Sequence, residues 1–458
     1  MGRYFETFHE LQRPTYASKF PPANALFIAS GWVLTGQPIV GVWISFAFMS
    51  AALYWMLHAW VGARPGLGLA LAFASRAATS YWSYTFWGGA VAAGAGALVL
   101  GASYRIVQSR GGVGNAIVLG LGLLVLANSR PYEGLLLALA IAVVLARWFW
   151  RDRREPWRRK SVCVMLPLTI VGAAGLLCMG IYDKAVTGDW HELPYQAYQH
   201  TRDSVPAFVW QRLPHIAPHA DRTIRSFDAW QDSIARVART PSGRLEYLVG
   251  VKDFFEFVLP LKLLFPLLLL PLAWRRYWFR FSVLTVGWVV CGMGLTSYFQ
   301  FHYAAPLVGL ILVIYGECLR WLSRLRVGHH TIGRALAAAT VVLFFLSGIG
   351  STAEELVRPL PSKQMSRAAQ RQLIADTLSH GGRRNLVVVR YGEQHSPLDE
   401  WVFNSADING SLVVWARDMG DPGNNPLLDY FRGRAAWLVE VNSDSGPYRV
   451  RPYVPRTP

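Results

Sequence analysis

The sequence predicts an α-helical polytopic membrane protein of about ten spans, with a small C-terminal α/β domain outside the membrane. Two observations predict this fold class. Apolar stretches long enough to cross a bilayer as helices recur over residues 39–350. Alternate connections between them are rich in arginine, as cytoplasmic loops are. Hydrophobic residues make up 53% of the chain, which exceeds the share usual in a soluble domain.

The N-terminal part, residues 1–38, is expected to be an external loop followed by a surface helix. Residues 23–35 are apolar but too few to cross a bilayer comfortably. Residues 39–350 then form the transmembrane bundle, in which a large external loop, 183–254, separates the sixth span from the seventh. The predicted spans lie near 39–62, 66–80, 85–104, 114–129, 132–150, 161–182, 256–273, 281–299, 303–321 and 335–350. Alternation of the basic loops places both chain ends outside.

Residues 362–458 are predicted to form a soluble α/β domain on the external side. Short apolar runs at 386–389, 412–415 and 436–441 are typical of buried strands. One candidate helix, at 367–378, precedes the first of these apolar runs, and another, at 426–431, lies between the second and the third. Strands and helices that alternate at this spacing predict a mainly parallel sheet.

The net charge of +17 would suggest a nucleic-acid partner if the protein were soluble. Much of this charge lies in loops between spans, so the predicted partners are membrane lipids and not nucleic acid. The four cysteines lie inside apolar spans and predict neither a disulfide framework nor a metal site. Because the chain has no phosphate-cradling P-loop, GxSxG elbow or HExxH helix, ATP-driven transport and the familiar protease chemistries lose support.

Polar residues at span boundaries are candidates for function, because burying charge near lipid is costly. The first cluster, residues 5–22, contains Glu6, His9, Glu10 and Lys19. A carboxylate and an imidazole three positions apart can share a proton in general acid–base catalysis. A solvated loop is the competing interpretation.

Two further clusters join neighbouring spans. In NSRPYEG, residues 128–134, Arg130 and Glu133 either pair with each other or leave Arg130 to bind a phosphate, and the sequence does not choose between these. In FHYAAP, residues 301–306, His302 and Tyr303 would lie at the external surface. Tyrosine is common there as an interfacial anchor.

The fourth cluster, residues 182–200, opens the large external loop and includes Tyr195 and His200. Aromatic faces beside carboxylates and hydrogen-bonding groups suit a sugar. The same mixture can also simply cap a helical bundle.

These clusters carry a resemblance to the GT-C superfamily of membrane glycosyltransferases. SKFPPANAL at 18–26 and HYAAPLVGLIL at 302–312 resemble segments of its family 39-like group, which includes protein O-mannosyltransferases and aminoarabinose transferases. VVVRYGEQH at 387–395 and YFRGRAAWLVE at 430–440 are similar to the ending of uncharacterised bacterial members.

The resemblance implies a multi-pass enzyme of the bacterial inner membrane that moves a sugar from a polyprenyl-phosphate donor to an acceptor on the periplasmic face. It implies that Lys19 contacts the donor phosphate, with Arg130 and His302 as helpers. Some enzymes of this architecture use a divalent cation and others do not, so the cofactor stays open.

One departure from the family concerns the catalytic acid. In the family, that acidic residue usually follows an initial spanning helix, and this chain begins downstream of that point. We therefore expect the first transmembrane helix to be missing from the chain, and in its absence Glu6 or Glu10, near His9, would have to serve as the base. Two alternatives remain: a transporter or flippase of a lipid-linked intermediate, and a non-catalytic envelope scaffold that binds a partner through its C-terminal domain.

Overall fold

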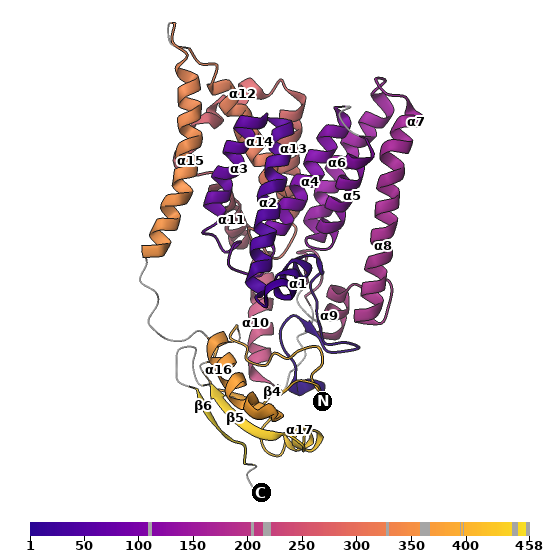
Figure 1. Ribbon diagram of the computed structural model, residues 1–458, viewed down its shortest axis with the longest axis vertical. Coiled ribbons are helices and arrows are strands. Elements are labelled where there is room, and N and C mark those ends of the chain that lie inside the picture. Colours follow the sequence, from indigo (N-terminus) through magenta and orange to yellow (C-terminus); the bar gives the residue numbers. More distant parts are fainter. Residues whose placement is uncertain are drawn as a thin grey trace.

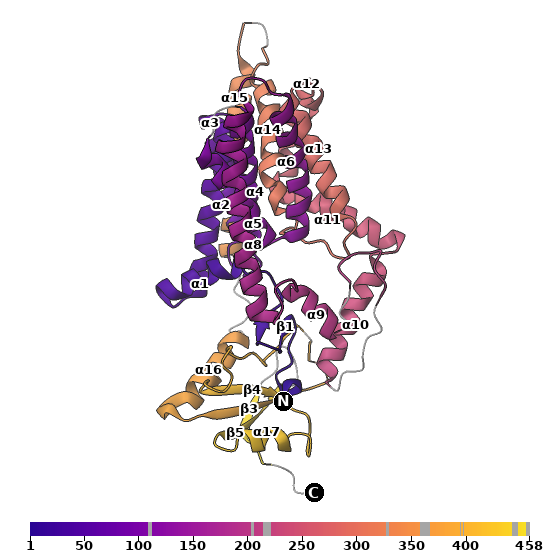
Figure 2. The ribbon, with the colours of Figure 1, turned by 90° about the vertical axis from the view of Figure 1, so that its right-hand side faces the viewer.

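The computed structural model describes residues 1–108, 112–202, 206–213, 221–326, 329–357, 367–393, 395–396, 398–441 and 448–454. Helices stand side by side in a bundle, and a small sheet domain lies beyond one end of it (Figures 1 and 2). We call this end the domain-side end and the other the far end. The fold class is the predicted one.

The bundle contains six helices that are long and apolar enough to cross a membrane, counted over the described residues. The protein is therefore an integral membrane protein. Its helices are α2 (Pro38–Trp60), α3 (Ala63–Ala77), α4 (Gly89–Val107), α5 (Val113–Ala127), α6 (Pro131–Arg151), α7 (Trp157–Lys160) with α8 (Leu166–Thr187), α13 (Tyr277–Met293), α14 (Val308–Leu322) and α15 (Ile332–Val357). A π-helical turn, Ser161–Met165, joins α7 to α8.

Helix α4 forms the centre of the bundle and is buried along nearly its whole length. Its glycines permit close approach of neighbouring segments. A Cβ on Gly96 would lie 2.6 Å from the carbonyl oxygen of Pro306, and one on Gly94 would lie 2.5 Å from the Phe48 ring. Larger residues at these positions would push the helices apart.

The predicted span at 256–273 is not one continuous helix. Helix α11 (Pro241–Val258) ends there, and after short turns at Leu261–Leu263 and Phe265–Leu269 the chain continues as α12 (Leu270–Ala273), bent by 67°. Prolines at 260, 266 and 271 remove the N–H donors that a continuous helix needs. Arg76 provides hydrogen bonds to two carbonyl groups in the last turn of α11. It donates to the carbonyl oxygens of Glu256 and Phe257 at 2.9 and 2.8 Å.

The predicted surface helix is α1 (Ala23–Thr35), which crosses the N-terminal end of α2 at the domain-side end of the bundle (Figure 2). The two helices touch at glycines. A Cβ on Gly31 would lie 2.0 Å from the backbone nitrogen of Gly41, so this crossing requires residues without side chains. Helix α1 is thereby fixed against the bundle.

The C-terminal domain is a four-stranded sheet in the order β4-β3-β5-β6. Strands β3 (Asn385–Tyr391), β4 (Val413–Arg417) and β5 (Ala435–Val441) are parallel, as predicted, and β6 (Arg449–Pro452) is an antiparallel edge strand. Helices α16 (Arg367–Ser379) and α17 (Asn425–Tyr430) accompany it. Tyr4 and Phe5 pack into one of the sheet's two hydrophobic cores, so the N-terminal segment is part of this domain.

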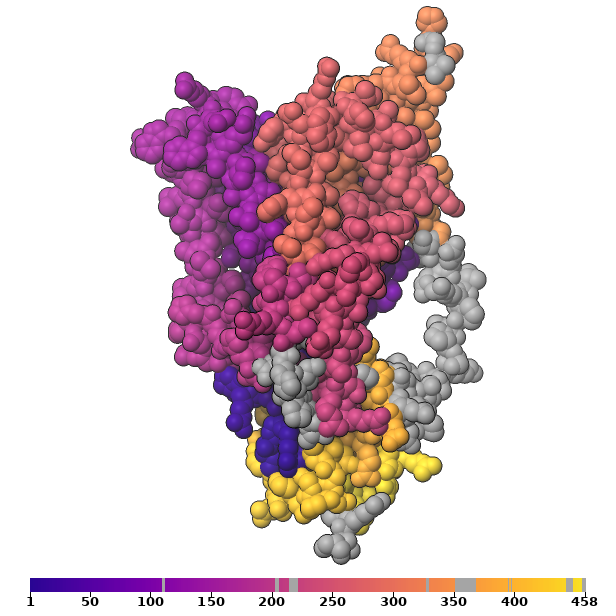
Figure 3. All heavy atoms as spheres, turned by 180° about the vertical axis from the view of Figure 1, so that it is seen from behind, coloured from indigo at the N-terminus to yellow at the C-terminus, as the bar shows by residue number. Residues whose placement is uncertain are grey.

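A connecting layer lies between the bundle and the sheet domain. It consists of the hairpin β1 (Glu10–Leu11) and β2 (Ala17–Ser18), with helices α9 (Pro194–Arg202) and α10 (Arg222–Val237). Seen from behind, the magenta and pink residues of this layer fill the space between the helices and the yellow domain (Figure 3). Most of the residues singled out in the sequence lie in it or beside it.

Candidate active site at the domain-side end

The hairpin β1/β2 places Lys19 beneath the bundle. Its strands are antiparallel, and the N–H of Lys19 donates to the carbonyl oxygen of His9 at 2.9 Å. The Lys19 side chain is only 8% exposed. Its ammonium nitrogen lies 4.2 Å from the ring centre of Tyr198 and 5.1 Å from that of Tyr195. The negative faces of aromatic rings stabilise a cation that has lost much of its water.

Helix α9 supplies these two tyrosines from one face, because residues three apart in a helix are neighbours. The Tyr198 hydroxyl accepts the backbone N–H of His9 at 3.3 Å, which ties α9 to the hairpin. Burial raises the pKa of Tyr195 to about 12, and the nearby hydroxyls of Tyr303 and Tyr198 contribute to the rise. Tyr195 therefore stays protonated at neutral pH and can donate a hydrogen bond.

Arg130 approaches from the bundle and contacts Tyr303, a tyrosine that in turn influences Tyr195. It is the residue before α6, and Pro131 begins that helix with a fixed backbone angle. The guanidinium carbon lies 4.7 Å from the ring centre of Tyr303, and Nη2 donates to the carbonyl oxygen of Trp87 at 2.9 Å. Arg130 and Glu133 form no ion pair within 4.0 Å in the described chain. The other N–H groups of the Arg130 guanidinium can therefore donate to a further acceptor.

His302 lies beside Tyr303 and is 3% exposed. The Tyr81 hydroxyl accepts the backbone N–H of His302 at 3.1 Å and lies 3.0 Å from Nδ1. If the hydroxyl donates its proton to Nδ1, the neutral imidazole carries its N–H on Nε2. Burial, reinforced by the Arg130 charge, lowers the pKa of His302 to about 2, so the imidazole is neutral.

The structure brings together six of the residues singled out in the sequence: His9, Lys19, Arg130, Tyr195, His302 and Tyr303. It places others elsewhere. His200 lies on the exposed side of α9, 3.1 Å from a carboxylate oxygen of Glu192. The backbone carbonyl of Glu6 accepts a hydrogen bond from Arg417 of the sheet domain. Glu10 lies on the other face of the hairpin from Lys19.

Glu133 occupies the first turn of α6 and is 7% exposed. It lies one helical turn beyond Arg130, and the two charges influence each other although they form no close pair. A buried carboxylate here lies at the edge of the site.

Several residues of the site escaped the sequence reasoning. Tyr81 and Trp87, from the loop between α3 and α4, surround His302, with ring centres 5.9 and 5.0 Å away. Asp232 on α10 is 9% exposed, and its Oδ1 has no hydrogen-bond partner in the described structure. Its charge acts on Tyr298, which Tyr195 and Tyr303 also influence. An acidic residue within the buried stripe of an amphipathic helix was the signal that could have revealed Asp232.

The described residues contain no group of three or more His, Cys, Asp or Glu side chains arranged to hold a metal ion. The side chains that the structure places at the site include the cations Lys19 and Arg130, the hydroxyls of Tyr195 and Tyr303, and the neutral imidazole of His302.

Fold and site together define a class: an integral membrane protein whose helices present a basic, tyrosine-lined site at one end, between the bundle and a small α/β domain. No protein-family model matches the chain, and no curated protein sequence matches it. Among solved structures, the chain is similar to the crystal structure of ArnT from Cupriavidus metallidurans bound to undecaprenyl phosphate. The identity is 15% and the TM-score 0.49, over 93% of this chain and 84% of that one. ArnT in the apo state gives 16% and 0.49, over 96% and 87%.

Proposed function

We propose that the protein is a membrane glycosyltransferase that moves a sugar from a polyprenyl-phosphate donor to an acceptor on the external face of the bacterial inner membrane. One observation carries the proposal. Lys19 and Arg130 approach neighbouring tyrosines from opposite sides, one from the hairpin and one from the bundle. Two partly desolvated cations at a membrane boundary suit the phosphate of a lipid donor.

The sequence resemblance supports the same site. SKFPPANAL contributes Lys19, and HYAAPLVGLIL contributes His302 and Tyr303. These segments are far apart in the chain, yet Tyr195 interacts with both Lys19 and Tyr303. The residues that carry the likeness to GT-C glycosyltransferases therefore converge on one place.

The proposed transfer is a single displacement at the anomeric carbon. The acceptor oxygen bonds to that carbon, the carbon–oxygen bond to the phosphate breaks, and the phosphate leaves with the bonding electron pair. Lys19 and Arg130 stabilise the charge that grows on the leaving phosphate. Tyr195 and Tyr303, which stay protonated, can donate hydrogen bonds to phosphate or sugar oxygens.

The acceptor hydroxyl must lose a proton, and we assign its removal to Asp232. Its Oδ1 is buried without a hydrogen-bond partner in the described chain, whereas Oδ2 accepts from Arg236 at 2.6 Å. A carboxylate oxygen without a hydrogen-bond partner has the lone pairs that a general base uses. Of the bases expected from the sequence, Glu10 has its carboxyl under the influence of Glu400 in the sheet domain, and the backbone carbonyl of Glu6 accepts from Arg417 of that domain.

The test is transfer from a labelled polyprenyl-phosphate sugar by membranes that contain the full chain. Lys19→Ala and Arg130→Ala should each slow transfer by about tenfold or more, because a hydrogen bond to a charged group is worth about 1.5–3 kcal/mol. Lys184→Ala is the matched control, since this lysine is exposed in the last turn of α8 and its ammonium nitrogen donates to the carbonyl oxygen of Gly188 at 2.5 Å. Equal rates in all four proteins would contradict the proposal.

The same preparation separates this proposal from its rivals. Movement of the labelled lipid across proteoliposomes without loss of its sugar would indicate a flippase. Partner capture that requires only residues 367–454, with no sugar transfer by the full chain, would indicate a scaffold. Either result would replace the proposed activity.

A further inference from the structure

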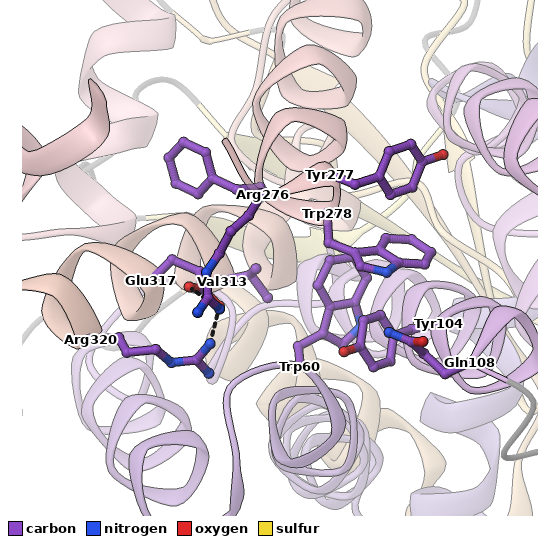
Figure 4. A pocket seen from close by; sticks show the side chains of 10 residues that line it. Trp60, Tyr104, Gln108, Arg276, Tyr277, Trp278, Val313, Glu317 and Arg320 are labelled. Carbon is purple, nitrogen blue, oxygen red and sulfur yellow. Dashed lines mark hydrogen bonds and ion pairs between the residues drawn. The ribbon is translucent and has the colours of Figure 1, made fainter. Parts of the chain in front are cut away.

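A second polar cavity lies at the far end of the bundle, away from the site described above. It has a volume of about 300 Å³ and lies among the ends of α2, α4, α13 and α14. Its lining includes Trp60, Tyr104, Arg276, Trp278, Glu317 and Arg320. Figure 4 shows the charged residues on one side of this cavity and the aromatic residues on the other.

The charged side contains two arginines that share one carboxylate. Arg276 Nη1 donates to Glu317 Oε2 at 3.2 Å, and Arg320 Nη1 donates to Glu317 Oε1 at 2.7 Å. The trio therefore keeps one positive charge. The side chain of Arg276 is 41% exposed, and its hydrogen bond to Glu317 is the only one that this side chain makes within the described residues. A monoanion bound in the cavity would neutralise this remaining positive charge.

The aromatic side is a compact wall. The rings of Trp60 and Tyr104 stack with centres 4.7 Å apart, and Trp278 lies 5.1 Å from Trp60 and 4.9 Å from Tyr104. Arg276 is also the cap residue of α13, and its side chain offers no acceptor to the first turn of that helix. The N–H groups of that turn add to the positive potential of the cavity.

The position of the cavity identifies the source of the anion. The described stretches at this end are 61–66, 104–108, 112–113, 147–163, 274–281, 317–326 and 329–334, and they hold many arginines but only Asp152, Glu155 and Glu317 as acids. A basic end faces the cytoplasmic leaflet, which carries anionic lipids. Trp274 and Tyr277 are 45% and 40% exposed next to the cavity, as residues at head-group depth are.

We propose that this cavity binds the head group of an anionic phospholipid from the cytoplasmic leaflet. Arg276 and Arg320 hold the phosphodiester, and the aromatic wall packs against the glycerol and the first part of the acyl chains. The volume suits a head group, since ligand cavities begin near 300 Å³. The site is separate from the proposed sugar-transfer site at the other end of the bundle.

Native mass spectrometry of the detergent-purified full chain tests this. Phosphatidylglycerol should bind about tenfold more tightly than phosphatidylcholine with the same chains, and about tenfold more tightly than soluble glycerol phosphate. Arg276→Gln should remove the preference for phosphatidylglycerol. Arg151→Gln, which removes an exposed arginine from the same end, should leave it unchanged.

Three outcomes would overturn the proposal. The wild-type protein could bind both lipids equally, and this result does not depend on whether any variant folds. Glycerol phosphate could bind as tightly as the lipid, which would assign the cavity to a soluble anion. Arg151→Gln could weaken binding as much as Arg276→Gln, which would indicate a diffuse surface charge instead of a defined site.

Discussion

Glu10 and Lys19 project from opposite faces of one hairpin. In the antiparallel register, Glu10 pairs with Ser18, and the next residue along each strand points the other way. Lys19 contacts the rings of Tyr195 and Tyr198 on the bundle side. The charge of Glu400, in the sheet domain, acts on the carboxyl of Glu10. The hairpin therefore separates two polar environments that the sequence presents as one cluster.

Replacing Glu10 by Gln should leave sugar transfer within about twofold of the wild-type rate, the scale of about 0.5 kcal/mol seen for substitutions outside a site. Asp232→Asn should slow it by about a hundredfold, as loss of a general base does. Initial rates in membranes measure both. If Glu10→Gln lost as much activity as Asp232→Asn, the assignment of the base to α10 would be wrong.

The stability of the protein should depend on pH through Glu10. Burial, together with the charge of Glu400, raises the pKa of this carboxyl above 4.5. The folded state then binds the proton more tightly than the unfolded chain, so stability falls as pH rises through the interval that begins near 4.5. Glu10→Gln should flatten this part of the curve of thermal midpoint against pH. Parallel curves for both proteins would contradict the pKa shift.

Arg417 should be essential for attachment of the sheet domain to the rest of the chain. It is 0% exposed and donates to the Glu6 carbonyl at 2.5 Å, to Asp221 Oδ1 at 3.2 Å and to the Glu400 carboxylate. Arg417→Met leaves Asp221 and Glu400 without their cation, which costs about 3–5 kcal/mol for a buried pair.

Hydrogen exchange measures this effect, with faster exchange expected in residues 4–11 and in α10 of the Arg417→Met variant. Arg432→Met is the control, because Arg432 is exposed in the same domain and donates only to a nearby backbone carbonyl. Unchanged protection of both segments in Arg417→Met would show that other contacts hold the domain.

Tyr198 should matter for its ring and much less for its hydroxyl. The Lys19 ammonium lies 4.2 Å from the ring centre, whereas the hydrogen bond from His9 to the hydroxyl is long, at 3.3 Å. Tyr198→Leu removes a cation–π contact worth about 1–2 kcal/mol in a desolvated site and should slow transfer by about tenfold. Tyr198→Phe should retain nearly the wild-type rate. The reverse order of the two rates would contradict this role.

The sequence predicted the elements that carry a strong local pattern. Helix α1 has the predicted bounds, and the parallel strands β3, β4 and β5 follow their apolar runs. Strand β6 was not expected, because all four of its residues are exposed and two are arginines, so it has no apolar run. The break after α11 depends on three prolines whose effect outweighs an apolar stretch that reads as one span.

The candidate site was only partly predictable for a different reason. Lys19, Arg130 and His302 carry local signals at span boundaries. The structure places Lys19 against Tyr195 and Tyr198, and Arg130 and His302 against Tyr303, which influences Tyr195. The separation of Glu10 from Lys19 depends on strand register, which residue spacing alone does not give. Asp232 lies on α10, whose Gln231 accepts a hydrogen bond from the Tyr298 hydroxyl, a contact between segments distant in the chain.

Binding of polyprenyl phosphate to the purified full chain tests the central claim most directly, because it requires no acceptor. Competition with a labelled polyprenyl phosphate should give dissociation constants about tenfold weaker for Lys19→Ala and for Arg130→Ala than for the wild type and Lys184→Ala. Four equal constants would show that the lysine and the arginine do not hold a lipid phosphate, and the proposed site would fall with them.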